Sequence, residues 1–272
     1  MKHLSRIYLI LIFGILYIPI LTLILFSFNA SNNTAVFTGF SLRWYIELFN
    51  SPETFEALRN TLILAVLSAL ISTVIGTAAA EGIFKMRSKL ARAAINSVTN
   101  IPMMNPDIVT GMSMMLFFVA VAAILGITYE DMGFTAMLIS HVTFCLPYVI
   151  LSVLPRINEL GNSLSEAALD LGCTPMQAFF KVKLPNIMPG VLSGMVMAFT
   201  MSLDDFVISY FVGSSNFQTL PLLIYSMTKK KVTPDMYALS TLVVVTIFIL
   251  LVISNFRSGK KVEKARKGGA KK

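Results

Sequence analysis

The sequence predicts an all-α integral membrane protein with six membrane-spanning helices. Of its 272 residues, 56% are hydrophobic and only 13% are charged, which is far from the composition of an ordinary soluble domain. The apolar residues are gathered into runs of about 20, the length that a helix needs to cross a hydrocarbon core of about 30 Å. Lys and Arg are distributed unevenly among the connections, which is typical of membrane proteins with one fixed orientation.

Taken in chain order, the first apolar run follows Lys2, His3 and Arg6. We expect this run to be retained as a span, because it is too long for a signal-peptide core and no clear small-residue cleavage site follows it. The predicted spans are residues 7–28, 61–84, a tract at 91–125, 134–154, a tract that opens at Pro189, and 237–256. We treat residues 1–256 as a single six-helix domain with a core at about 58–254, followed by a basic tail at 257–272.

The charges predict which side of the membrane each connection faces. With the N-terminus inside, the inner segments carry 17 Lys and Arg residues and the outer ones carry five. Basic residues favour the cytoplasmic side, so we expect both termini to be cytoplasmic. Eight of the 16 tail residues are basic, and we interpret the tail as a solvated segment beside anionic lipid, not as a nucleic-acid site.

The two cysteines give no indication of a disulfide. Cys145 falls in the fourth span and Cys173 in a cytoplasmic connection. His141 and Cys145 share a helix face, but two such side chains do not make a metal site, so we expect a packed polar pair and no bound metal.

A short hairpin at residues 163–185, SLSEAALDLGCTPMQAFFKVKLP, interrupts the apolar sequence on the cytoplasmic side. Ser163 and Glu166 have the spacing of a capping box, and Gly172 is suited to close the first helix. Thr174 begins a second box with proline at the first helical position, and Pro185 is predicted to end the second helix.

The hairpin also carries features that capping does not require. Ala167 and Ala168 leave the first helix with little bulk beside Glu166, so another backbone can approach closely. Met176, Phe179 and Phe180 form an apolar face in a segment that should be wet. We expect a partner surface to cover this face. The alternative is a simple connection between spans, with Glu166 acting only as a cap.

Adjacent acidic residues lie deep in the fifth predicted span. Asp204 and Asp205 follow Pro189 by 15 and 16 residues, which corresponds to about 22–24 Å along a helix in a core of about 30 Å. An ionised carboxylate there costs several kcal/mol unless it meets water, a cation or a partner. The pattern favours a pathway for a cationic solute, with Ser202 adding a hydroxyl. Alternatively, the pair caps the outer helix end, pairs with a companion subunit, or follows a helix that ends near Asp204 before a re-entrant segment.

Two further patterns concern helix breaks and helix packing. Within the tract 91–125, the prolines of IPMMNPD predict that the helix bends or unwinds, with Asn105, Pro106 and Asp107 at the cap and first turn of the next helix. Asp107 either faces the solute pathway, as broken transporter helices do, or only caps this helix. Gly190 and Gly194 have the spacing that lets membrane helices pack closely.

The hairpin resembles the EAA loop of permease subunits in ATP-binding-cassette importers. The matching pattern is Glu-Ala-Ala at 166–168, Gly172, Val182 and Leu184-Pro185. The segments MNPDIVTGMSMM, SHVTFCLPYVI, FTMSLDDFVISYFV and TLPLLIYSM extend the likeness over nearly the whole chain, and together they resemble the spermidine/putrescine importer permeases of the PotC type.

This resemblance implies a type I importer permease (MetI-like) fold in the bacterial plasma (inner) membrane. It implies a non-catalytic subunit that forms half of the translocation pathway. A second homologous permease subunit, a dimer of ATPase subunits and an extracytoplasmic polyamine-binding protein would complete the transporter. The chain would bind no cofactor, since ATP and Mg would be used by the ATPase. The sequence contains no G-x-x-x-x-G-K-[ST] phosphate loop, which agrees with this division of labour.

The resemblance also assigns residues. Those implied to contact the ATPase are Glu166, Ala167, Ala168, Gly172, Met176, Phe179 and Phe180. Those implied to line the solute pathway are Trp44, Asp107, Ser202, Asp204 and Asp205. The Trp44 ring could contact an ammonium group through its π face or could lie in the aromatic belt at the membrane surface.

Three other functions stay open at this stage. An importer for ferric iron, sulfate or an amino acid belongs to the same class, although an anion carrier would require cationic groups in place of Asp204 and Asp205. An intramembrane aspartyl protease needs aspartates from separate spans and has no use for the hairpin. A non-transporting membrane sensor would not require the ATPase.

Overall fold

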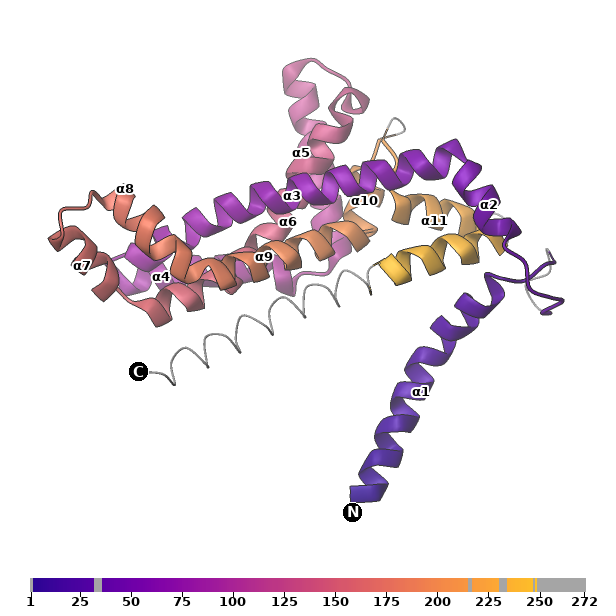
Figure 1. Cartoon of the computed structure of the whole chain (residues 1–272). Coiled ribbons are helices and arrows are strands. Elements are labelled where there is room, and N and C mark those ends of the chain that lie inside the picture. Colours follow the sequence, from indigo (N-terminus) through magenta and orange to yellow (C-terminus); the bar gives the residue numbers. More distant parts are fainter. Residues whose placement is uncertain (1, 32–35, 215–216, 230–233, 247, 249–272) are drawn as a thin grey trace. The chain divides into compact units, whose positions relative to one another are not determined.

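The structure, a computed structural model, describes residues 2–31, 36–214, 217–229, 234–246 and 248 (Figure 1). Within these ranges the regular elements are helices, and β pairing is limited to two isolated bridges, so the all-α prediction is confirmed. Five helical segments of the described chain are long and apolar enough to span a membrane: Tyr8–Phe26, Pro52–Lys85, Asp107–Leu125, Tyr129–Leu160 and Pro175–Asp204. The predicted sixth span is helical at 237–246, and most of its remainder, like the whole tail, lies outside the described residues.

The chain divides into two compact units, Arg59–Thr219 and the combination of Met1–Leu58 with Leu220–Lys272. The unit Arg59–Thr219 contains most of α3 (Pro52–Lys85), followed by α4 (Lys89–Met104), α5 (Asp107–Leu125), α6 (Tyr129–Leu160), α7 (Ser163–Asp170), α8 (Pro175–Ala178), a π-helical turn η1 (Phe179–Lys183), α9 (Leu184–Asp204) and α10 (Val207–Val212). Its buried core includes Phe118, Val149, Val153, Ile157, Ile187 and Ile208.

Close packing of α6 against α9 is the basis of this unit. A methyl group added to Gly190 would lie 2.9 Å from the Ser152 carbonyl oxygen, and one added to Gly194 would lie 3.2 Å from Val149 Cα. The absence of a side chain at both places therefore allows the two backbones to approach this closely. The packing role predicted from the spacing of the two glycines is confirmed.

The other unit contains α1 (Lys2–Phe26), α2 (Arg43–Asn50), the start of α3, α11 (Leu220–Lys229) and the helical residues 234–246. Its small core is made by Leu48, Ala57, Leu220, Leu223 and Leu239. The apolar stretch of α1 between Tyr8 and Phe26 has no buried residues within the chain. This suits a helix that faces lipid or another subunit.

The capping box predicted at Ser163 is wrong. Ser163 is already the first helical residue of α7, and the N-cap is Asn162, which makes no side-chain cap bond. The reason is that α6 ends only at Leu160, so Asn162 must turn directly into α7 with helical dihedrals (φ −97°, ψ −21°). A capping side chain normally requires an extended N-cap. Glu166 is consequently exposed and not engaged in a cap.

The predicted helix end at Pro185 is also wrong, and the predicted opening of the fifth span at Pro189 falls inside a helical segment. The segment from Pro175 to Asp204 is continuous, and both prolines lie within it. The cause is the π-helical turn η1, in which the Leu184 N–H bonds to the Phe179 carbonyl, five residues back. This turn resets the hydrogen-bond register, so Pro185 occupies a first-turn position of α9, where a missing N–H is tolerated.

Candidate functional site

The break between α4 and α5 was correctly predicted. Asn105 ends α4, its N–H bonding to the Ile101 carbonyl, and Pro106 precedes the first residue of α5, Asp107. Asp107 is exposed, and the N-cap residue Pro106 makes no side-chain cap bond. Its carboxylate lies in the first turn of α5, where the helix dipole favours a negative charge.

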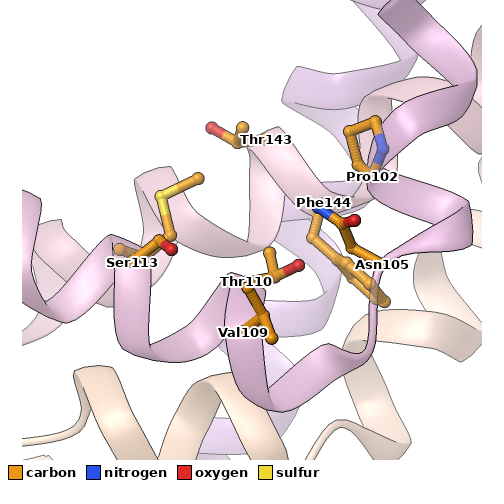
Figure 2. Close-up of a pocket in the computed structure, with 8 residues that line it drawn as sticks. Pro102, Asn105, Val109, Thr110, Ser113, Thr143 and Phe144 are labelled. Atoms are coloured by element: carbon orange, nitrogen blue, oxygen red, sulfur yellow. The ribbon is translucent and has the colours of Figure 1, made fainter.

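A small cavity of about 170 Å³ opens beside this break (Figure 2). It lies among α4, α5 and α6, and its wall combines apolar groups with the polar side chains of Asn105, Thr110, Ser113 and Thr143. The Thr143 hydroxyl donates to the Ile139 carbonyl of its own helix, 2.8 Å away. No charged side chain lines the cavity, so it could accommodate an aliphatic segment but could not by itself bind an ammonium group.

The helix α9 ends at Asp204, and the chain becomes extended at Asp205 (φ −65°, ψ 121°) before α10 begins. The Asp205 carboxylate accepts the backbone N–H groups of Ile208 (3.3 Å) and Ser209 (2.9 Å). It therefore satisfies donors in the first turn of α10 that have no partner within the helix. The alternative in which the helix ends near Asp204 describes the backbone correctly.

His141 joins α6 to this turn through a buried polar network. Its Nδ1 lies 2.8 Å from Ser202 Oγ, and its Nε2 lies 3.3 Å from Ser209 Oγ and 3.5 Å from Asp205 Oδ2. Ser68 of α3 donates a further hydrogen bond of 2.8 Å to Ser202. An ionised carboxylate only accepts, so Nε2 carries the proton when it faces Asp205, and Nδ1 then accepts from Ser202.

The network changes the interpretation of two sequence predictions. Ser202 is buried and already bonded within the chain, so its hydroxyl contributes to the bundle interior in this structure. His141 and Cys145 are both fully buried, which agrees with a packed polar pair, and Cys145 donates to the Ala198 carbonyl. Sequence reasoning missed the link from His141 to Asp205. The one available signal was a histidine inside an otherwise apolar run.

Three predicted pathway carboxylates come together in this unit. Asp204 and Asp205 are neighbours in the chain, and α5, which begins at Asp107, packs against α10, which follows Asp205: a methyl group added to Gly111 would lie 3.4 Å from the Val207 carbonyl oxygen. Their settings differ, because Asp204 and Asp107 are exposed whereas the Asp205 side chain is only 7% exposed. The group thus presents two carboxylates outward and holds one inside.

Trp44 belongs to the other unit. It is buried, its Nε1–H donates to the Asn29 carbonyl (2.6 Å), and the Arg43 guanidinium lies 5.1 Å from its ring centroid. The indole N–H and one region of the ring are therefore used within the chain. Its assignment to the solute pathway stays a prediction.

The hairpin formed by α7 and α8 connects α6 to α9 and lies at one end of these helices (Figure 1). At its turn Gly172 has φ +85°, and the N–H groups of Gly172 and Cys173 bond to the carbonyls of Leu169 and Ala168. This is the Schellman arrangement that glycine favours, and it confirms Gly172 as the helix terminator. The second box is confirmed too, since Thr174 and Gln177 exchange side-chain-to-backbone bonds of 3.1 and 3.3 Å.

The outward side of the hairpin is apolar. Leu171, Met176 and Phe180 are 87%, 68% and 55% exposed, and Phe179 is half-buried with its ring against Phe180. Ala168 is buried while its neighbour Ala167 is exposed beside Glu166. These exposed groups form one candidate docking surface, which we call the hairpin face: Glu166, Ala167, Leu171, Met176 and Phe180.

Long apolar helices, a broken helix beside grouped carboxylates and an exposed hairpin on one end define a multi-pass membrane transport protein. Residues 72–265 match the family described as "Binding-protein-dependent transport system inner membrane component". The chain belongs to this family, and it is a multi-pass inner membrane protein.

Curated relatives match over almost the full length. The chain is 37% identical over 267 residues to the putrescine transport system permease protein PotI of Escherichia coli K12, covering 96% of this chain and 95% of that protein. It is 36% identical over 253 residues to the spermidine/putrescine transport system permease protein PotC of Haemophilus influenzae, covering 93% of this chain and 95% of that protein.

Solved structures support the fold. A chain of a bacterial ABC transporter that imports the acidic polysaccharide alginate superposes with a TM-score of 0.74 at 18% identity, covering 95% of this chain and 98% of that one. A chain of the MetNI methionine ABC transporter gives 0.61 at 20% identity, covering 77% and 98%. The predicted type I importer permease fold is confirmed.

Proposed function

We propose that this chain is a permease subunit of an ATP-driven importer of polyamines such as putrescine and spermidine. The observation that carries the proposal is the group of three carboxylates, Asp107, Asp204 and Asp205, in a bundle of apolar helices. Negative charge at membrane depth is costly unless a cation or water meets it. Polyamines carry several ammonium groups, and the two full-length relatives named above are polyamine permeases.

Within this site the carboxylates have different roles. Asp204 and Asp107 are exposed, so they contact the ammonium groups of the solute. Asp205 holds α10 and faces His141, so it fixes the position of its neighbour and contributes a negative field. Trp44 and Ser202 are the remaining proposed pathway residues.

The chain itself is non-catalytic and binds no cofactor under this proposal. The hairpin face docks on a separate ATPase subunit, which exists as a dimer and uses ATP with Mg. Gly172 sets the angle between the two short helices, and Phe179 supports Phe180 from behind. Exposed apolar groups of this size are expected where a partner covers them.

A second homologous permease subunit would complete the pathway, and an extracytoplasmic polyamine-binding protein would deliver the solute. Both termini would be cytoplasmic, because the connections on that side carry most of the Lys and Arg. This orientation puts the hairpin face on the side where ATP is available.

Uptake of labelled putrescine by proteoliposomes that contain the complete transporter tests the proposal. We expect Asp204→Asn to reduce uptake by about 10- to 100-fold, because it removes a charge-assisted contact of about 1.5–3 kcal/mol. Asp205→Asn should reduce uptake and also lower the thermal stability, since the carboxylate bonds inside the chain. Glu56→Gln, an exposed carboxylate outside this group, is the matched control and should change neither.

Unchanged uptake by Asp204→Asn in an assembled complex would remove the cation site from the proposal. Transport of an anionic or neutral solute in place of putrescine by the unaltered complex would refute the polyamine assignment.

A further inference from the structure

A buried ion pair lies where the hairpin joins the membrane helices. Lys183, the last residue of the π-helical turn η1, places its Nζ 2.7 Å from Oε2 of Glu81 on α3. The Lys183 side chain is 3% exposed and that of Glu81 is 12% exposed. The exposed pairs Arg43–Glu47 and Arg156–Glu159 join residues of one helix, whereas this pair joins two elements that are far apart in the sequence.

The surroundings fix the α3 side of the pair. The second Glu81 oxygen lies 3.1 Å from Nζ of Lys85, one turn further along α3. The Lys183 Nζ also lies 4.3 Å from the centroid of the Phe84 ring, and Arg92 donates to the carbonyls of Phe84 and Met86. These contacts hold the end of α3 in place. Lys183 therefore meets both the Glu81 carboxylate and the face of the Phe84 ring.

The attraction between Lys183 and Glu81 depends on charge more than on direction. Glu81 Oε2 makes no hydrogen bond of good geometry within the described chain, although the lysine nitrogen is 2.7 Å away. Separating the two charges in a dry setting leaves each without compensation, which is strongly unfavourable.

The π-helical turn is the part of this connection that departs from α-helical hydrogen bonding. Its wider hydrogen bonding is less regular than that of an α-helix, and π turns of this kind are frequent at functional sites. If Lys183 were not paired with Glu81, a movement of α7 and α8 could distort this turn without moving α3. With Lys183 tied to Glu81, the movement is passed to α3.

The helix α3 leads from this pair to the buried polar network. Ser68 and Glu81 are 13 residues apart on it, or about 20 Å along a straight helix. Ser68 donates to Ser202, two residues before Asp204. A shift of α3 at its Glu81 end therefore reaches the segment that carries the exposed carboxylate.

We propose that the Lys183–Glu81 pair is a positioning element that couples the hairpin to α3, so that movement at the ATPase surface reaches the solute pathway. This inference rests on the proposed function, because it requires that the hairpin face docks on an ATPase. Neither residue contacts the solute or the ATPase under this proposal, and both act by position alone.

The test uses the complete transporter in proteoliposomes, with ATP hydrolysis and putrescine uptake measured in the same sample. In Glu81→Gln and Lys183→Met we expect the ATP hydrolysed per solute imported to rise by about fivefold or more. The amount of ATPase that co-purifies should be unchanged, because the hairpin face is intact. The matched control is Lys85→Met, which removes the exposed partner of the same carboxylate (66% exposed) and should keep the ratio of the unaltered complex.

An unchanged ratio in assembled Glu81→Gln and Lys183→Met complexes would overturn the proposal. If either single variant fails to assemble because one charge is left buried, the double variant Glu81→Gln/Lys183→Met decides, since it removes both charges. If the assembled double variant hydrolyses more ATP per solute imported than the unaltered complex, the proposal is supported. If the two ratios are equal, it is overturned. Failure of the proposed function is distinct, because the unaltered complex itself would then lack putrescine uptake or a bound ATPase.

Discussion

Substitution of Gly172 distinguishes an effect on the stability of the permease from an effect on the coupling of ATP hydrolysis to solute uptake. Its φ of +85° lies in the left-handed region, and a methyl group built on it would meet no atom within 4 Å. The cost of Gly172→Ala is therefore backbone strain alone, about 1–2 kcal/mol. A penalty of this size shifts the balance between the native turn and a rearranged turn by about 5- to 30-fold.

Gly126 is an almost ideal control for this substitution. It closes α5 with φ +68°, has no atom within 4 Å of its methyl position, and uses the same pair of backbone bonds at the helix end. Gly126→Ala should therefore cost about the same 1–2 kcal/mol. In a chain of this size both substitutions should lower the melting temperature by a few degrees, about 2–4 °C per kcal/mol.

The reconstituted transporter then distinguishes the two positions. We expect Gly172→Ala to retain ATP hydrolysis while losing most of the solute uptake, because its strain is relieved by tilting α8 and the apolar side chains that follow. Gly126→Ala should keep the normal ratio of ATP hydrolysed to solute imported. Equal coupling in the two variants, whether normal or impaired, would refute the argument that the angle at Gly172 transmits movement.

Two further predictions concern packing and docking. Gly194→Leu should lower the melting temperature markedly, because even its Cβ would lie 3.2 Å from Val149 Cα and overpacking of this kind costs about 1–3 kcal/mol or more. Gly82→Leu is the control and should leave the melting temperature unchanged, because nothing lies within 4 Å of its Cβ position. Equal shifts in the two variants would contradict the close packing of α6 against α9. Phe180→Ser should reduce ATPase binding by about tenfold, as expected for an aromatic anchor at an interface, without changing the thermal stability of the permease; undiminished co-purification of the ATPase would argue against the hairpin face.

Features that depend on local chemistry were predictable. The break between α4 and α5 follows from Pro106 and its neighbours, and the turn at Gly172 follows from the need for a left-handed residue. The second capping box, with Thr174 and Gln177, involves only four consecutive residues. In each case the physical cause lies within one helical turn of the residue concerned, so the sequence contains all that is needed.

The incorrect predictions depended on the register of the chain or on distant partners. Pro185 was expected to stop a helix, but the π-helical turn before it moved the proline into a permitted position. The ion pair of Lys183 with Glu81, about one hundred positions earlier, was not predicted at all. No periodicity or spacing within the hairpin indicates such a contact, because the partner is brought there by the fold.

Asp204 and Asp205 point in different directions because the helix α9 ends between them. On a continuous helix the side chains of neighbouring residues point about 100° apart. Because α9 ends at Asp204 and the backbone becomes extended at Asp205, the second carboxylate turns inward to the first turn of α10 and to His141, while the first stays exposed. The inward carboxylate fixes the helix end from which the outward one is presented. Under the proposed function, the Asp204 carboxylate would therefore meet a cation without rearrangement of the chain that holds it, as a preorganised site requires.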